Sequence, residues 1–436
     1  MKPFKLLSLA LALLSPFSHA ALTDNDQQLI DRYGEQIYRN SRAVGMVMVV
    51  VNKNQTAQRF YGQTRPGNRT QPKADSLLRI ASISKTMTGE VLASLAMQQR
   101  VRMDDPLQKY APQGVALPTD KSGKPITLLN LATHTSGFPR EMPGEKPQDT
   151  PVFVWPTQQQ RWQWLSGTRS NFAPGLRAQY SNLAFDFLAD AMAAATGRPY
   201  AALLSEKITA PLGMRDTTLT PTPEQCARLM EGYGASPCLD TRAAGGSGGI
   251  YSTPNDMQRW LQDLLRPQND ARRELRDRMF HMYFKRDQLR SLRGMDVAGK
   301  ADELGLGWIR MEGTPQAPEI IQKTAGGGGF IGYVALAPKQ DVAVWVGLTR
   351  TGGTHYQNMS GGVNKLVTSL SGYQPVSVAA PARVRAKPVK AKAHAVAAQP
   401  KAKTKAKTKS QTKTASKTKT PAKTAHKQGH VKKTAQ

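Results

Sequence analysis

The chain has 436 residues, of which 39% are hydrophobic, with 60 Lys and Arg, 31 Asp and Glu and only two Cys. Two Cys exclude a disulfide-stapled small scaffold and a Cys-rich zinc module. The net charge of +29 is unevenly spread, because residues 381–436 hold 17 Lys and Arg and no acidic residue. The remaining +12 is typical of a mildly basic globular protein, so the total charge does not indicate nucleic-acid binding.

The first residues have the layout of a secretory signal peptide. Lys2 and Lys5 precede a short apolar run at 6–14, and Ser18-His19-Ala20 has the small-x-small pattern of a cleavage site. The run is shorter than the about 20 apolar residues that a membrane-spanning helix needs. We therefore predict a cleaved signal peptide at 1–20 and a mature protein that starts at Ala21 and is exported to the periplasm, free there or peripheral at the inner membrane.

Export would place the two cysteines in an oxidising compartment. Cys226 and Cys238 lie in a segment that contains Gly and Pro. We expect them to form a disulfide, the alternative being two free buried thiols.

Hydrophobic periodicity predicts the helices and strands of the body. The helix that we expect at 75–100 carries residues 82–85 in its first turn. The middle of the chain, about 103–290, consists mostly of helical patches broken by Pro and Gly loops. The clearest elements, in chain order, are a helix at 29–37, a buried strand at 45–51, helices at 75–100, 182–195 and 256–265, strands at 319–324, 332–337 and 342–348, and a last helix at 363–370.

Strands at both ends with helices between them predict one α/β domain at 21–378. Its sheet would be built from about 21–100 and 300–375, and about 101–299 would form a mostly helical part. Residues 379–436 are rich in Lys, Ala and Thr and have no aromatic residue. Such a basic tail cannot bury enough apolar surface to offset the entropy of ordering, so we expect it to be disordered.

The first candidate catalytic motif is Ser82-Ile83-Ser84-Lys85, which has the pattern S-x-x-K. The same pattern recurs in the tail, so its position at the start of a predicted helix is what makes this copy a catalytic candidate. Residues three apart lie on one face of a helix, so Lys85 can reach the Ser82 hydroxyl. A neighbouring amine can take the proton of a serine and make it a nucleophile. The alternative is a helix cap with a solvated lysine.

The second candidate is Tyr180-Ser181-Asn182, just before a strongly apolar helix. Nearby ammonium groups favour the phenolate of a tyrosine, which would make Tyr180 a general base. The amide of Asn182 can donate to a substrate carbonyl and accept from a lysine. Tyr356-Gln357-Asn358 matches the same pattern, but it follows the third candidate in the chain.

The third candidate is Lys323-Thr324-Ala325-Gly326, where a predicted strand enters a run of glycines. A lysine and a hydroxyl on a strand edge can hold a carboxylate, and backbone N–H groups there can face an oxyanion. Lys121-Ser122-Gly123 has a related pattern but lies among turn residues, and we interpret it as a turn.

Three other features are weaker. Gly245-Gly246-Ser247-Gly248-Gly249 fits the nucleophile elbow of α/β-hydrolases, but no clear strand precedes it, so a glycine-rich turn is the simpler interpretation. His134 lies in a Thr/Ser turn and is expected to be structural. No metal-binding spacing occurs in the body, so we expect neither a metal nor a cofactor.

In this order, Ser82-x-x-Lys85, Tyr180-x-Asn182 and Lys323-Thr324-Ala325 resemble the three motifs of serine penicillin-recognising enzymes of the class C β-lactamase group. The resemblance covers about residues 26–371. It is strongest to the AmpH-type penicillin-binding proteins, which are D-alanyl-D-alanine carboxypeptidase/endopeptidases. Segments that agree with this subgroup or with the wider group are 65–68, 131–137, 151–157, 211–214, 235–238, 248–257 and 305–308.

The resemblance implies a β-lactamase/transpeptidase-like fold, with an antiparallel sheet flanked by helices and a helical insert. It implies that Ser82 attacks the D-Ala-D-Ala bond of a peptidoglycan stem peptide, or the D-Ala-diaminopimelate cross-link, and forms an acyl-enzyme. Lys85 and Tyr180 would share the proton transfers. The resemblance further implies that β-lactams acylate the same serine.

The remaining roles are also carried over from the family. Lys323 and Thr324 would bind the substrate carboxylate, and Asn182 its amide. The oxyanion would lie between the backbone N–H groups of Ser82 and Gly326. Ala325 stands where the family usually has Gly, and its methyl group would be expected to crowd a ligand.

Three alternatives stay open: a class C-like β-lactamase, an esterase of the same fold, and a non-catalytic envelope-binding protein whose tail carries the function. The tail of 17 positive charges is expected to bind anionic envelope polymers or lipid phosphate, with a dispensable solvated extension as the alternative. No specific nucleic-acid partner is expected.

Overall fold

The computed structural model describes residues 22–119, 122–168 and 173–373. The predicted signal peptide and the basic tail lie outside these residues. Within them, no helix has both the length and the apolar character that crossing a membrane requires.

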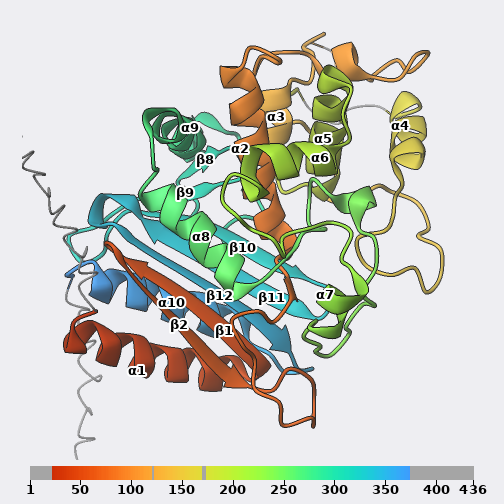
Figure 1. The fold of residues 1–436 in the computed structure, drawn as a ribbon. Coiled ribbons are helices and arrows are strands. Elements are labelled where there is room, and N and C mark those ends of the chain that lie inside the picture. The colour runs from red at the N-terminus through yellow and green to blue at the C-terminus, as the bar shows by residue number, and fades with distance from the viewer. Residues whose placement is uncertain (1–21, 120–121, 169–172, 374–436) are drawn as a thin grey trace, which may run out of the picture. The chain divides into compact units, whose positions relative to one another are not determined.

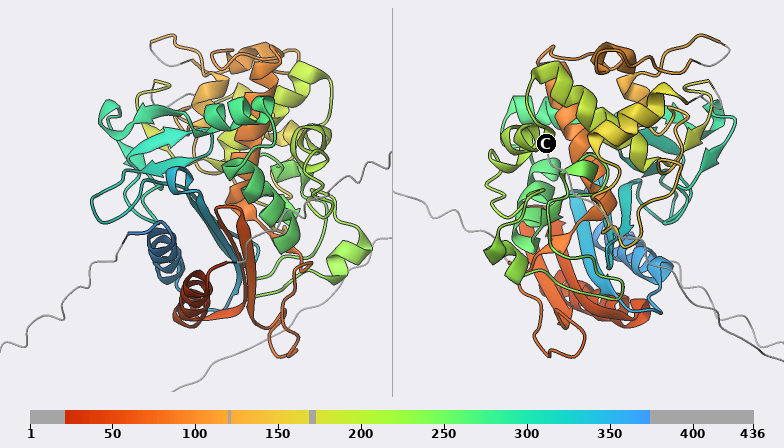
Figure 2. Two further views of the ribbon diagram at one scale, coloured as in Figure 1. Left: turned by 60° about the vertical axis from the view of Figure 1, so that its left-hand side comes forward. Right: turned by 90° about the vertical axis from the view of Figure 1, so that its right-hand side faces the viewer.

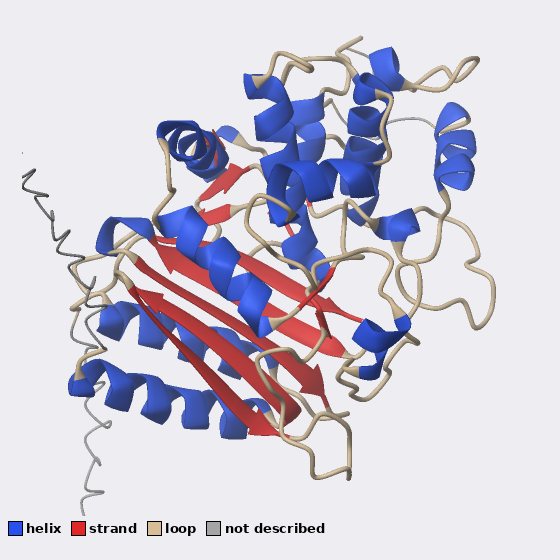
Figure 3. Cartoon of the chain, viewed as in Figure 1, coloured by secondary structure: helices blue, strands red, loops and turns tan. Residues whose placement is uncertain are grey.

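One eight-stranded sheet forms a layer of the domain with helices on both of its faces (Figure 3). All neighbouring strands run antiparallel, and the first and last strands of the sheet in chain order lie next to each other, where Met46 pairs with Leu348 and Val50 with Val344. In spatial order the strands are β2 (Gln55–Gly62), β1 (Ala43–Asn52), β12 (Val342–Arg350), β11 (Phe330–Ala337), β10 (Ile320–Gly327), β9 (Ile309–Met311), β8 (Glu303–Gly305) and β6 (Met282–Lys285).

The central strands are buried on both faces because helices cover each side. Side chains alternate along a strand, so Val47, Val49 and Val51 of β1 enter one hydrophobic core while Met46, Met48 and Val50 enter another. The near-continuous apolar sequence of β1 follows from this double burial.

Two helices pack side by side on one face of the sheet, α1 (Asp24–Ser41) and α10 (Tyr356–Leu370) (Figure 2). The Thr23 hydroxyl caps α1 by accepting from the Asp26 N–H. The opposite face is covered by α8 (Pro254–Leu265) and α2 (Ser84–Met97), and the helical part lies beyond them (Figure 1). This arrangement confirms the predicted α/β fold of an antiparallel sheet flanked by helices.

The helical part centres on α5 (Asn182–Thr196), which packs against α2. Two short strand pairs link it to the rest of the domain: β3 (Leu78–Arg79) with β5 (Tyr251–Ser252), and β4 (Ala178–Gln179) with β7 (Leu292–Arg293). The other helices are α3 (Leu128–Ala132), α4 (Gln158–Ser166), α6 (Tyr200–Leu204), α7 (Pro223–Ala227) and α9 (Asp270–Phe280).

The helix expected at 75–100 is shorter than predicted. Leu78 and Arg79 pair with Ser252 and Tyr251 instead of entering the helix, and α2 begins only at Ser84. Between them a 3₁₀ turn spans Ala81–Ile83, and Ala81 has a φ of +45° that no α-helix can contain. The strand pairing therefore outweighs the helical pattern here.

Candidate active site

Ser82 lies in the strained turn that joins β3 to α2. Ala81, immediately before it, is buried and adopts a left-handed φ, which is unfavourable for a residue with a Cβ. Ser82 itself is half-buried, whereas Ile83, Ser84 and Lys85 are buried. The turn thus leaves the Ser82 side chain accessible from one side at the beginning of a buried helix.

Lys85 is fully buried, and three acceptors surround its ammonium group. Nζ lies 3.2 Å from the Ser82 Oγ and donates to Asn182 Oδ1 at 2.7 Å and to the Ser247 carbonyl at 2.5 Å. All three hydrogens of the ammonium therefore have an acceptor, as the burial of a cation requires. The first two predicted motifs meet at this atom.

Tyr180 lies between two ammonium groups. Its ring centroid is 5.0 Å from Lys85 Nζ and 4.9 Å from Lys323 Nζ, and its phenol is a hydrogen-bond partner of Ser82 and Lys85. Burial alone would raise the pKa of Tyr180, but the two ammonium groups outweigh burial and lower the pKa from 10.0 to about 8. A fraction of the phenolate is therefore present near neutral pH, next to the serine.

Lys323 extends from the edge of β10 toward Tyr180. It is fully buried, and among the described residues its Nζ has no hydrogen-bond partner. Burial is the main cause that lowers its pKa from 10.5 to about 8; Tyr180 opposes the shift, and Lys85 and Arg140 add to it. A buried cation without a hydrogen-bond acceptor is costly, so the site is suited to receive an anion.

Thr324 and Gly326 continue the same strand edge. Thr324 is half-buried, and its hydroxyl is a hydrogen-bond partner of Tyr356, at the start of α10. Gly326 is exposed, and a Cβ added there would meet only the Phe330 carbonyl, at 3.9 Å. The space beside Gly326 is therefore open, which leaves its backbone accessible to a ligand.

Ala325 does not crowd this opening, contrary to the expectation from the sequence. Its methyl group is 5% exposed and belongs to the hydrophobic core. It lies opposite Gly332 of β11, where a Cβ would stand 3.5 Å from the Ala325 Cβ and 3.7 Å from Ile83 Cδ1. The missing side chain at Gly332 makes the room that the methyl group of Ala325 fills.

The glycine-rich segment 245–249 is a turn, yet it contributes to the site through its backbone. Ser247 supplies the carbonyl that binds Lys85, and its N–H and hydroxyl both donate to the buried Asp186 of α5. Burial raises the pKa of Asp186 to about 7, while Arg161 and Ser247 oppose this shift. Neither Asp186 nor the carbonyl had a motif by which sequence reasoning could find it.

His134 lies behind Tyr180 and is buried. The two rings stack with centroids 4.5 Å apart, and Nδ1 accepts the Ser181 N–H at 3.0 Å. Burial, followed by Lys323 and Lys85, lowers the pKa of His134 well below 6.5, so the imidazole is neutral at pH 7. The ring supports Tyr180 and the N-terminus of α5 and makes no hydrogen bond with Ser82.

The loop after His134 borders the site with two charged side chains. The Arg140 guanidinium lies 4.9 Å from the Tyr180 ring centroid, and Glu141 accepts a hydrogen bond from Asn182 Nδ2. One of the two N–H donors of Asn182 is thus bound to Glu141, which leaves the second for a substrate carbonyl. Sequence reasoning missed both residues because their loop has no periodicity.

The weaker matches take other places. Tyr356 lies behind Thr324 and not beside Ser82, and its pKa is raised well above 10.0 by burial and by Tyr333. Ser122 and Gly123 lie on an exposed turn, while Lys121 is outside the described residues. The candidate at Lys323 is the one of these patterns that the structure places beside Tyr180.

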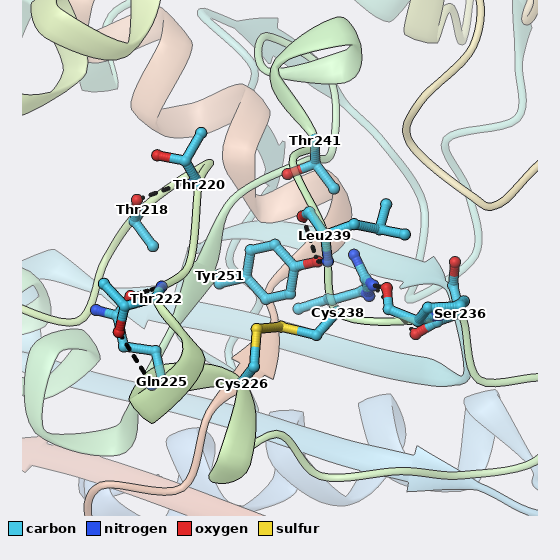
Figure 4. Close-up of a disulfide and its surroundings, with 12 residues drawn as sticks. Thr218, Thr220, Thr222, Gln225, Cys226, Ser236, Cys238, Leu239, Thr241 and Tyr251 are labelled. Carbon is cyan, nitrogen blue, oxygen red and sulfur yellow. Dashed lines mark hydrogen bonds between the residues drawn. A yellow bond between two sulfur atoms is a disulfide. The ribbon is translucent and has the colours of Figure 1, made fainter.

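A disulfide joins Cys226 of α7 to Cys238 (Figure 4). Tyr251 lies beside it, donating its hydroxyl to the Leu239 carbonyl and accepting the Leu239 N–H. The buried Arg79 donates to the carbonyls of Ser236 and Pro237 in the same loop. The disulfide-closed segment is therefore fastened to the strand that precedes Ser82.

Comparison with known proteins agrees with this geometry. The family model described as Beta-lactamase matches residues 27–367. The chain is 53% identical over 353 residues to D-alanyl-D-alanine-carboxypeptidase/endopeptidase AmpH of Escherichia coli (strain K12), covering 81% of this chain and 91% of that protein. It is 24% identical over 347 residues to a beta-lactamase of Pseudomonas fluorescens, covering 73% of this chain and 92% of that protein.

A solved structure also places the chain among these proteins. The beta-lactamase/D-alanine carboxypeptidase from Yersinia pestis, crystallised with citrate, superposes with a TM-score of 0.76 at 54% identity and covers 79% of this chain and 98% of its own. The identity to this protein and to AmpH is more than twice that to the P. fluorescens beta-lactamase. The chain belongs to the Beta-lactamase family of serine hydrolases, in its AmpH-type group.

Proposed function

We propose that the protein is a serine D-alanyl-D-alanine carboxypeptidase and endopeptidase of peptidoglycan. The observation that carries this proposal is the buried Lys323 ammonium, which has no acceptor among the described residues and faces Tyr180 beside Ser82. An enzyme that cleaves next to a free carboxylate needs such a cation close to its nucleophile. A simple esterase does not.

The mechanism assigns each residue of the site a task. Ser82 Oγ attacks the carbonyl of the penultimate D-Ala, and its proton passes to the phenolate form of Tyr180 or to the neutral amine form of Lys85, which both contact it. The backbone N–H groups of Ser82 and Gly326 stabilise the oxyanion. The C–N bond then breaks, and the leaving amine takes the proton.

Binding and deacylation complete the cycle. Lys323 and Thr324 hold the carboxylate of the leaving D-Ala, or that of diaminopimelate in a cross-link. Asn182 binds the amide of the acyl donor through the N–H that Glu141 does not use. Water then attacks the ester carbonyl of the acyl-enzyme, Ser82 leaves with a proton, and the shortened peptide is released.

A β-lactam presents the same carbonyl and carboxylate and acylates Ser82. Whether the acyl-enzyme persists or hydrolyses quickly distinguishes a penicillin-binding peptidase from the second candidate, a class C-like β-lactamase. The higher identity to AmpH than to the P. fluorescens beta-lactamase favours the peptidase.

The test is a time course of intact-protein mass after addition of benzylpenicillin, with Ser82→Ala alongside and the drug assayed in the same tube. A separate reaction measures D-Ala release from a pentapeptide. We expect a lasting adduct and D-Ala release from the wild type only. Rapid drug loss with a vanishing adduct would instead identify a β-lactamase, and turnover by Ser82→Ala would refute the assignment of the nucleophile.

We also propose that the protein works in the periplasm, exported by the signal peptide at 1–20, and that residues 379–436 bind anionic envelope polymers or lipid phosphate. The 17 positive charges without an acid support the second point. Deletion beyond Ser377 should abolish binding to purified envelopes, and raising the salt concentration should weaken it. Binding that survives both changes would refute the electrostatic role, and an unprocessed chain in the cytoplasm would refute export.

A further inference from the structure

Phe153 lies between two backbone segments of the active site. A Cβ added to Gly248 would stand 2.6 Å from its Cε1, and a Cβ added to Gly327 would stand 2.8 Å from its Cζ. Gly248 follows the residue whose carbonyl binds Lys85, and Gly327 follows the proposed oxyanion residue Gly326. Because neither glycine has a side chain, the Phe153 ring fits between them. Two segments that are far apart in the sequence therefore fix the position of the ring.

The backbone of Phe153 is held in place against its own preference. Its φ of +72° lies in the left-handed region, which a side chain disfavours. The preceding residue, Val152, donates its N–H to the Ser236 Oγ at 3.1 Å. Ser236 belongs to the segment that ends at the disulfide and also contacts the turn after β10, where its N–H donates to Gly328. Backbone strain that the surroundings enforce is typical of functional positions.

The direction of β10 decides which part of the substrate meets this ring. The leaving group is assigned to Lys323 and Thr324, and the oxyanion to Gly326. A substrate that lies along this edge therefore continues past Gly326 on the acyl side of the scissile bond. Gly327 and the Phe153 ring come next in that direction, and the ring is half-buried, so one side of it stays open to a ligand.

We propose that Phe153 is the specificity-determining residue for the acyl donor. Its ring packs against the aliphatic side chain of the residue that precedes the penultimate D-Ala, the position of a diamino acid in a stem peptide. An aromatic face binds methylene groups well, while the polar end of such a side chain can remain in water. This inference rests on the proposed function and names the part of the substrate that the site selects.

The test compares two peptides that share the leaving group, diacetyl-L-Lys-D-Ala-D-Ala and acetyl-Gly-D-Ala-D-Ala. We expect Phe153→Ala to lower kcat/KM about tenfold for the lysine peptide and to leave the glycine peptide within about twofold, since the lost contacts involve only the side chain. For Phe153→Leu, which keeps an apolar side chain, kcat/KM for the lysine peptide should lie between the values of the wild type and of Phe153→Ala. Val154→Ala is the matched control, because that side chain lines a separate cavity with Arg161 and Asp190.

The outcomes separate this inference from the function on which it rests. Equal losses on both peptides would show that the ring only supports the loop, and would overturn the inference. So would a wild type without preference between the peptides, or a Phe153→Ala effect that changes when D-Lys replaces the leaving D-Ala. If the wild type released D-Ala from neither peptide, the proposed function itself would fail.

Discussion

Asp186 accepts both the backbone N–H and the hydroxyl of Ser247, each at 3.0 Å, from a site where the carboxyl is only 4% exposed. Ser247 in turn offers its carbonyl to Lys85 Nζ. A residue near the start of an apolar helix therefore fixes the orientation of the backbone that holds the catalytic lysine. Asp186 touches no reacting atom, so it is a positioning residue.

Replacing Asp186 should consequently impair acylation more than binding. In Asp186→Ala, Ser247 loses both of its hydrogen bonds to α5, one from its N–H and one from its hydroxyl. We expect acylation by benzylpenicillin to slow by about tenfold to a hundredfold, because a small displacement of a catalytic group lowers the rate by this order. Ser247→Ala keeps the N–H bond and should show a smaller effect. Mass spectrometry of the adduct gives the rates. An unchanged rate in Asp186→Ala would show that Lys85 needs no such support.

The pH dependence of the reaction follows from two coupled groups. Tyr180 is neutral below its pKa of about 8, so acylation should rise as the pH increases toward 8. Lys323 loses its positive charge as the pH rises through its own pKa of about 8, so binding of a substrate carboxylate should weaken above it. For D-Ala-D-Ala peptides we therefore expect a bell-shaped kcat/KM whose two apparent pKa values belong to the pair.

The control for this profile is a substrate with an amidated C-terminus. Because it has no carboxylate for Lys323 to bind, its kcat/KM should be low but should not fall on the alkaline side. Lys323→Arg, which keeps its charge at all these pH values, should likewise lose the alkaline limb with the normal peptide. An identical bell-shaped pH profile of kcat/KM for both substrates would contradict the assignment of Lys323 as the residue that binds the carboxylate.

Ala325 should affect stability more than activity. Because its methyl group packs in the core opposite Gly332, Ala325→Gly should lower the free energy of unfolding by about 1 kcal/mol through added backbone freedom and lost burial. Acylation should stay within about threefold. Ala325→Val overfills the same space and should lower the free energy of unfolding by about 1–3 kcal/mol. Urea unfolding measures the effect on stability, and the penicillin time course measures the effect on acylation. A large gain in the acylation rate for Ala325→Gly would show that the methyl group of Ala325 does crowd the ligand.

A buried ion pair stabilises the helical part away from the site. Arg161 of α4 binds Asp190 of α5 through two hydrogen bonds of 2.7 Å, and both side chains are under 10% exposed. Arg161→Met leaves the Asp190 carboxylate buried without its cation and should lower the free energy of unfolding by about 3–5 kcal/mol. The double variant Arg161→Met with Asp190→Leu should recover most of this loss. A single variant as stable as the wild type would contradict the prediction.

The sequence predicts those parts of the site that local rules govern. Ser82 and Lys85 are neighbours because a turn and a helix start bring residues three apart together, and the buried strands β1, β10, β11 and β12 appear as apolar runs. Tyr180 and Lys323 required the family resemblance, since their proximity to Ser82 is a property of the tertiary fold. The strand β2 was missed because its sequence, QTAQRFYG, is largely polar and half-buried.

The residues that were missed share a physical cause. Asp186 looks like an isolated polar position on a helix, and its role depends on the turn of Ser247 that packs beside it. Phe153 and Glu141 lie on a loop without periodicity, and only the folded chain shows which backbone they touch. The start of α2 at Ser84 depends on the pairing of Leu78 with Ser252, a contact that no local pattern encodes.

The order of strands in the sheet has a consequence for when the enzyme becomes active. Ser82 is made early in synthesis, but β10, which carries Lys323, is joined to β1 only through β11 and β12. The anion site beside the nucleophile therefore cannot be completed until the last strand of the sheet, which ends at Arg350, has been made and paired. A chain truncated before β12 would therefore carry the nucleophile without a complete anion site, and formation of the site depends on the last strand of the sheet.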